Sequence, residues 1–131
     1  MSKSKRSPKD SFIAIPRIVM KQRKYRELSA YARMLLSEML FDYRGFNNGD
    51  LQATWSIMNQ RGFRSRSTLN KAIKELLDSG IIVKTRQGGR NRCSLYAVTF
   101  QSIDECTYPR TGMSKFDAGI RPGPAPMTWR D

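Results

Sequence analysis

Two stretches of the sequence concentrate side chains that donate hydrogen bonds to anions. The first holds Arg64, Ser65, Arg66, Ser67, Asn70, Lys71 and Lys74, and the second holds Lys84, Arg86, Arg90, Asn91 and Arg92. A guanidinium presents a planar fork of donors that matches two acceptors at once, whereas an ammonium is a point charge with little geometric selectivity. Hydroxyl and amide groups add neutral, directional hydrogen bonds. We therefore expect these stretches to bind a polar, anionic partner rather than to catalyse a reaction.

The residue types that most enzyme and metal chemistry requires are absent or wrongly spaced. The chain has no histidine, which excludes Ser-His-Asp and Cys-His nucleophiles and histidine metal ligands. Its two cysteines, Cys93 and Cys106, match no zinc spacing and suit a reducing compartment. The QGGR segment at 87–90 lacks the spacing and the Lys-Ser/Thr ending of a phosphate-binding loop. The sequence thus predicts no enzyme, no metal, no cofactor and no small-molecule ligand.

The positive charge is large and unevenly distributed. The 131 residues carry a net charge of +13, with +8 in residues 1–26, −2 in 27–50, +7 in 51–100 and none in 101–131. Such an excess opposes compaction and requires an anionic partner, of which nucleic acid, an anionic membrane surface and an acidic protein are the usual kinds. The sequence has no apolar run long enough to span a bilayer and no signal-peptide core. We expect a cytoplasmic protein that does not enter the membrane.

The clearest element is an amphipathic helix that follows Ser29, a good N-cap residue. Apolar residues from Leu28 to Tyr43 recur with the helical period. The segment 45–50 is rich in the turn formers glycine and asparagine, and a short strand is expected at Leu51 and Gln52.

Two more helices and a hairpin are expected downstream. One helix runs from Ala53 or Thr54 to Gln60 or Arg61, and the next from Ser65 or Ser67 to Asp78; Gly62 and Gly80 end them. In the latter helix, one face collects the apolar residues Leu69, Ala72, Ile73, Leu76 and Leu77, and the other face is polar. The β-rich stretches 81–86 and 93–100 flank a Gly-Gly loop, which predicts a hairpin.

These elements divide the chain into three parts. Residues 1–11 are predicted to be a disordered basic arm, residues 12–100 a single domain, and residues 101–131 a Pro/Gly-containing tail largely without a core of its own. At the start of the domain, Phe12, Ile15 and Val19 are expected to pack against the core. The basic residues that follow are Lys21, Arg23, Lys24 and Arg26, and they are candidates for additional contacts with the anionic partner.

The order helix, short strand, helix, tight turn, helix, hairpin makes a resemblance specific. Residues 62–83, GFRSRSTLNKAIKELLDSGIIV, resemble the corresponding segment of winged helix-turn-helix DNA-binding proteins of bacteria, plasmids and phages. The family pattern has a glycine turn, a Ser/Thr-rich helix start and an ending E-L-x-x-x-G followed by two aliphatic residues. The resemblance covers about residues 28–100. It implies a mostly α fold with a small β-hairpin wing, in the α+β class.

The resemblance also implies roles for individual residues. The start of the helix at 65–78 would enter the major groove of DNA, where Arg66 suits guanine and Asn70 suits adenine. Lys71 and Lys74 suit phosphates, and the arginines of the wing suit the backbone or the minor groove. The expected function is sequence-specific binding of double-stranded DNA by a homodimer, as a transcription regulator or a plasmid or phage replication or partition protein, associated with the nucleoid or a plasmid. Two alternatives stay open: an RNA-binding or ribosome-associated protein, and an adaptor that uses the fold as a scaffold.

Overall fold

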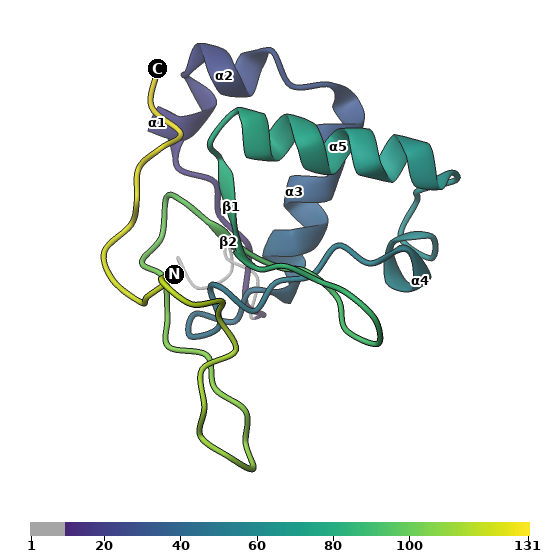
Figure 1. Cartoon of the computed structure of the whole chain (residues 1–131). Helices are drawn as coiled ribbons and strands as arrows, with labels where there is room; N and C mark the ends of the chain where they lie inside the picture. The colour runs from purple at the N-terminus through teal and green to yellow at the C-terminus, as the bar shows by residue number, and fades with distance from the viewer. Residues whose placement is uncertain (1–9) are drawn as a thin grey trace.

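Five helices and one two-stranded antiparallel sheet form a small α+β domain within residues 10–131, the part of the chain described by this computed structural model (Figure 1). The elements are α1 (Arg17–Met20), α2 (Arg23–Arg26), α3 (Ala30–Asp42), α4 (Trp55–Met58), α5 (Arg66–Asp78), β1 (Ile82–Arg86) and β2 (Leu95–Val98). All but residues 10 and 11 of the predicted arm at 1–11 lie outside the described residues. No helix in residues 10–131 is long and apolar enough to cross a membrane.

Helix α3 begins where the sequence predicts. The Ser29 side chain accepts a hydrogen bond from the Ala32 amide at 3.2 Å, so one of the free amides of the first turn has a partner. The helix buries Leu35, Leu36 and Met39 completely. Each such side chain contributes roughly 1.5–3 kcal/mol to folding. Helix α3 therefore supplies much of the core against which α5 packs.

Helix α5 confirms the predicted division into an apolar and a polar face. Leu69, Ala72 and Leu76 are buried, and the helix is capped by Ser65, whose hydroxyl accepts a hydrogen bond from the Thr68 amide at 3.1 Å. Gly80 ends the turn that follows, with a φ of 76° that favours glycine.

Helix α4 is a single turn, shorter than the sequence predicts. It ends at Met58 and not at residue 60 or 61, because the chain turns through Gly62, which has a φ of 114°. The Phe63 amide donates to the Met58 carbonyl at 3.2 Å, and the Phe63 side chain is 1% exposed. This turn joins α4 to α5 and fixes where α5 begins.

The hairpin pairs β1 with β2 in an antiparallel register that sets Ile82 opposite Val98. Both strands are shorter than the stretches expected at 81–86 and 93–100. A β-bulge interrupts the register between Lys84 and Arg86. The expected strand at 51–52 is a single bridge, in which Leu51 and Tyr96 exchange backbone hydrogen bonds of 3.1 and 2.8 Å.

The segment before α3 folds into two one-turn helices that the sequence did not reveal. Val19 in α1 and Tyr25 in α2 are buried in the core, as predicted for Val19. Phe12, which we expected to pack beside it, is 83% exposed.

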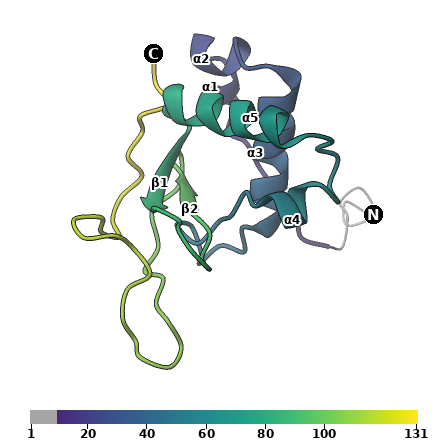
Figure 2. The same ribbon diagram turned by 45° about the vertical axis from the view of Figure 1, so that its right-hand side comes forward.

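Residues 101–131 contain no helix or strand, yet they pack against the rest of the domain and form hydrogen bonds with it. Trp129 is 4% exposed and belongs to the main core. The Thr128 hydroxyl donates to the Gly80 carbonyl at 2.7 Å, and the Asp131 carboxylate accepts from the amides of Arg23 and Lys24 at 2.7 and 3.2 Å. In Figures 1 and 2 the yellow C-terminal trace accordingly ends beside α1 and α2. The segment expected as a tail thus completes the core of the domain and anchors α2.

Candidate nucleic-acid interface

The solvent-facing side of α5 collects most of the predicted contact residues of this helix. We call this surface the α5 face; it consists of Arg66, Ser67, Asn70, Lys71 and Lys74, all of which are exposed. Lys74 forms an ion pair with Asp78 at 2.7 Å, with both side chains largely in solvent. Such an exposed pair is worth only about 0.3–0.5 kcal/mol, so Lys74 can exchange Asp78 for another anion at little cost.

Ser65 has a structural role that removes it from the candidate contacts. Its hydroxyl caps α5 and lies 2.8 Å from the Thr68 hydroxyl and 3.3 Å from that of Ser67. These local hydrogen bonds use the capacity of the Ser65 hydroxyl. Replacing such a cap with alanine typically costs about 1 kcal/mol of stability.

An open cleft of about 450 Å³ lies between α4 and the turn that leads into α5. Trp55, Asn59 and Arg64 line it. The Arg66 guanidinium lies over the indole ring of Trp55, 5.7 Å from its centroid, at the outer limit of a cation–π contact. The sequence did not single out either Trp55 or Asn59 as a contact residue. Trp55 is half-buried and Asn59 is exposed, so both can contact a partner held by Arg64 and Arg66.

The loop between β1 and β2, which we call the hairpin loop (residues 87–94), carries the second group of cations. Gly89 and Arg92 exchange backbone hydrogen bonds of 3.0 and 3.3 Å, which places Arg90 and Asn91 at the tip. Both are exposed, and Asn91 has a φ of 63°, in the left-handed region that asparagine tolerates.

The other cations near the hairpin loop are partly engaged within the protein. The Arg92 guanidinium is 3.7 Å from Asp117 and donates to the Gln87 carbonyl at 3.3 Å, with half of its side chain still exposed. Lys84 donates to the Gln87 side chain at 2.9 Å and is half-buried. Arg90 is therefore the most accessible cation of this loop.

Arg86 corrects the sequence interpretation, which placed it among the contacts of the loop. It is only 7% exposed. Its guanidinium donates to the Cys93 carbonyl at 3.2 and 2.8 Å and to the Tyr108 hydroxyl at 2.8 Å. Arg86 ties the hairpin to residues 101–131 and is not available to a partner.

The cations of α1 and α2 form a separate group at the other end of α5. Lys21, Arg23 and Arg26 are exposed, whereas Lys24 is half-buried and donates to the Thr128 carbonyl at 3.3 Å. In Figures 1 and 2 both short helices lie by the C-terminal end of α5, away from its N-terminal end.

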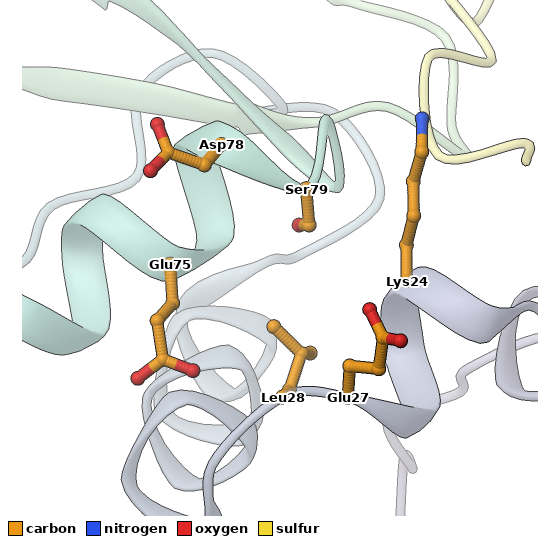
Figure 3. A pocket seen from close by; sticks show the side chains of 6 residues that line it. All are labelled: Lys24, Glu27, Leu28, Glu75, Asp78 and Ser79. Carbon is orange, nitrogen blue, oxygen red and sulfur yellow. The ribbon is translucent and has the colours of Figure 1, made fainter.

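A cleft of about 290 Å³ between α2 and the C-terminal end of α5 is lined by three acidic side chains and by Lys24 (Figure 3). Glu27, Glu75 and Asp78 line it. The Glu75 carboxylate accepts from the amide and the hydroxyl of Ser29 at 2.9 and 2.7 Å, so it joins α5 to the start of α3. The acidic side chains of this cleft interrupt the basic surface between the exposed cations of α1 and α2 and the α5 face.

The described residues show no site for metal chemistry. Residues 10–131 contain no group of three or more cysteine or acidic side chains placed to hold a metal ion. Burial raises the pKa of the Cys106 thiol to about 11, so this group is protonated and unreactive at neutral pH. The arrangement favours recognition of an anion by exposed donors.

Comparison of the chain with protein-family models, curated proteins and solved structures gave no match.

Proposed function

We propose that this protein binds double-stranded DNA in a sequence-specific manner, with α5 as the recognition helix of a winged helix-turn-helix and the hairpin loop as its wing. The observation that carries the proposal is the division of α5. The helix buries its apolar side and turns Arg66, Asn70 and Lys71 outward, and the exposed Arg90 lies on the neighbouring loop. In Figure 1 the start of α5, the short α4 and the hairpin loop follow one another along one side of the domain.

The α5 face suits a major groove in size and chemistry. An α-helix with its side chains is about 10–12 Å across, and the major groove of B-DNA is about 12 Å wide. Arg66 and Asn70 lie in the first half of α5 and are long enough to reach base edges, guanine for the guanidinium and adenine for the amide. Lys71 and Lys74 contact phosphates, which position the protein without reading sequence.

The hairpin loop contributes a second contact beside the groove. Arg90 at its tip meets the DNA backbone or enters a narrow minor groove, where the negative potential is strongest. Asn91 and Arg92 add neighbouring donors. A net charge of +13 accelerates the encounter with DNA of any sequence. In this role the protein regulates transcription, or maintains a plasmid or phage genome through replication or partition.

A selection of bound sequences tests the proposal. Genomic fragments captured by the purified protein are sequenced, and the recovered sites are then used in competition assays against unrelated duplex DNA and against structured RNA. We expect one recurrent motif, and affinity for it at least about a thousandfold higher than for unrelated duplex. Equal affinity for all duplexes would contradict sequence-specific recognition, and preference for structured RNA would favour the RNA-binding alternative.

A further inference from the structure

Exposed aromatic rings at the end of α3, in the loop that follows it and in the segment before α1 are not explained by the DNA-binding proposal. We call them together the phenylalanine face: Phe12 is 83% exposed, and Phe41 and Phe46 are each 68% exposed. Ile13, 47% exposed, adjoins Phe12. Single exposed apolar residues are normal on a protein surface, but gathered rings of this size mark a surface that another molecule covers.

The phenylalanine face also borders a groove. A groove of about 610 Å³ runs beside it, and Phe12, Phe41 and Tyr43 line its apolar part. Asp10 and Arg44 line the same groove and are the only charged residues among its lining. The groove thus combines aromatic rings with one acid and one base, in contrast to the strongly basic α5 face, and it suits a protein surface rather than a nucleic acid.

The phenylalanine face is positioned independently of the α5 face. The start of α3 is joined to α5 by the Ser29–Glu75 hydrogen bonds, and the helix runs from there away from α5 (Figure 1). At its far end, Arg61 pairs with Asp42 at 3.1 Å and lies 5.2 Å from the Phe41 ring centroid, covering one side of that ring. The rest of the ring stays in solvent, so a partner can cover this face while α5 is occupied.

We propose that the phenylalanine face binds a second copy of this chain in a two-fold dimer. In such an interface the same surface occurs on both subunits, so each group must find its complement within that surface. The phenylalanine face meets this requirement: the Phe12 ring of one copy fits the apolar groove of the other, and Asp10 of each copy can pair with Arg44 of the other.

The size of the face is of the order that a small two-fold interface needs. A stable interface buries about 800 Å² on each subunit. The three phenylalanines, at their observed exposure, supply roughly 400 Å² of this area, since a phenylalanine buries about 150–250 Å² when fully covered. Ile13, Tyr43 and the stem of Arg44 around the rings add to this area, so the face supplies more than half of what a stable interface buries.

The mass of the protein in solution, measured without DNA by light scattering and sedimentation equilibrium, tests the proposal. We expect twice the 15.1 kDa of the chain at micromolar concentration. Phe46→Glu and Phe12→Glu should each weaken dimerisation at least about a hundredfold, because each change places two charges in the apolar interface. Met113→Glu is the matched control, since Met113 is also 68% exposed but lies outside this face, and it should remain a dimer. Thermal unfolding checks that the variants are folded.

Three outcomes would overturn the proposal. One is a wild-type protein that stays a monomer at high micromolar concentration, which would assign the face to residues 1–9 or to a different protein. Another is a Met113→Glu variant that dissociates as readily as Phe46→Glu. The third is a wild-type dimer that Phe46→Glu and Phe12→Glu leave intact. None of these outcomes bears on DNA recognition by a single chain, so the dimer and the DNA-binding proposal can fail separately.

A charge exchange tests the pairing across the axis. Asp10→Arg and Arg44→Asp, each alone, set like charges against each other twice per dimer and should weaken the dimer roughly fivefold or more. The double variant restores opposite charges and should recover most of the lost affinity. A double variant weaker than both single variants would contradict the two-fold arrangement.

Discussion

Arg86 and Arg90 belong to the same hairpin, but Arg86 is buried and Arg90 is exposed. Replacing Arg86 with methionine keeps most of its volume but removes the donors to the Cys93 carbonyl and the Tyr108 hydroxyl. These acceptors are part-buried, so the loss of their donor costs, for each group, an amount toward the lower end of the roughly 1–3 kcal/mol of a fully buried acceptor, and part of this loss is offset because the buried charge is removed as well. We expect Arg86→Met to lower the free energy of unfolding by about 2 kcal/mol, measured by urea denaturation.

Arg90→Gln should weaken DNA binding and leave stability almost unchanged, which is the reverse of the effect expected for Arg86→Met. The exposed side chain of Arg90 contributes little to folding, so the free energy of unfolding should change by less than about 0.5 kcal/mol. If Arg90 neutralises one phosphate, its loss lowers the slope of log K against log salt by about 0.9. This change in slope corresponds to roughly an eightfold lower affinity of the variant at 0.1 M salt, if the variant and the wild type bind equally at 1 M salt. Fluorescence anisotropy with a labelled duplex over a salt series measures it.

Matched variants separate the two roles. Arg121→Gln removes the same charge from an exposed site in the C-terminal segment and should alter neither the salt slope nor the stability. Arg86→Met should leave the salt slope of the folded protein unchanged. The reasoning would be refuted if Arg86→Met left stability intact and reduced the slope, because Arg86 would then be a DNA contact, as the sequence alone suggested.

Three further predictions follow from contacts elsewhere in the domain. Trp129→Ala should lower the free energy of unfolding by about 3–5 kcal/mol in urea denaturation, since it empties part of the core; a loss below about 1 kcal/mol would mean that the C-terminal segment is not docked. Asp78→Asn removes an acid beside the α5 face and frees Lys74, so DNA affinity should rise about two- to fivefold in the same anisotropy assay, and a fall would contradict it. The Arg23 amide donates a hydrogen bond to the Asp131 carboxylate and holds the pKa of this carboxyl below its ordinary value. This anchor of α2 therefore persists above about pH 4 and is lost only as the pH falls through the lowered pKa. A midpoint at or above about 3.9 in a carboxyl titration by NMR would contradict this prediction.

Short sequence patterns predicted the helix caps, the glycines that end the helices and the two faces of α5. Ser29 caps α3, Gly62 and Gly80 adopt the positive φ expected of glycines after a helix, and α5 divides its apolar and polar residues as its helical period indicates. Ser65 and Ser67 were equally plausible caps of α5, and the hydrogen bond from Thr68 decides for Ser65. Each of these features depends on residues close together in the chain.

Contacts between distant segments could not be predicted in this way. Arg86 was expected among the contacts of the loop because it is one of the cations that flank the Gly-Gly loop, but a bulge lies between Lys84 and Arg86 and the Tyr108 hydroxyl accepts a hydrogen bond from the guanidinium. Asn48 appeared to be one turn residue among several, yet it is fully buried and bonds Val98 and the backbone at 101 and 102. Trp129 stands among prolines and glycines, and no local pattern indicates that it packs in the core. The sequence therefore predicted the residues of the α5 face. It did not reveal that Arg86 and Ser65 are bonded within the protein.

The affinity of the protein for its selected site relative to unrelated duplex, measured for single variants of α5, tests the central claim most directly. Arg66→Ala and Asn70→Ala should each lower this ratio by about 1–3 kcal/mol, or roughly 5- to 150-fold, because each removes a base contact. Lys71→Ala should weaken binding to both duplexes alike and leave the ratio unchanged, because it removes only a phosphate contact. Equal weakening of both duplexes by all three variants would contradict the claim that α5 reads the base sequence of DNA.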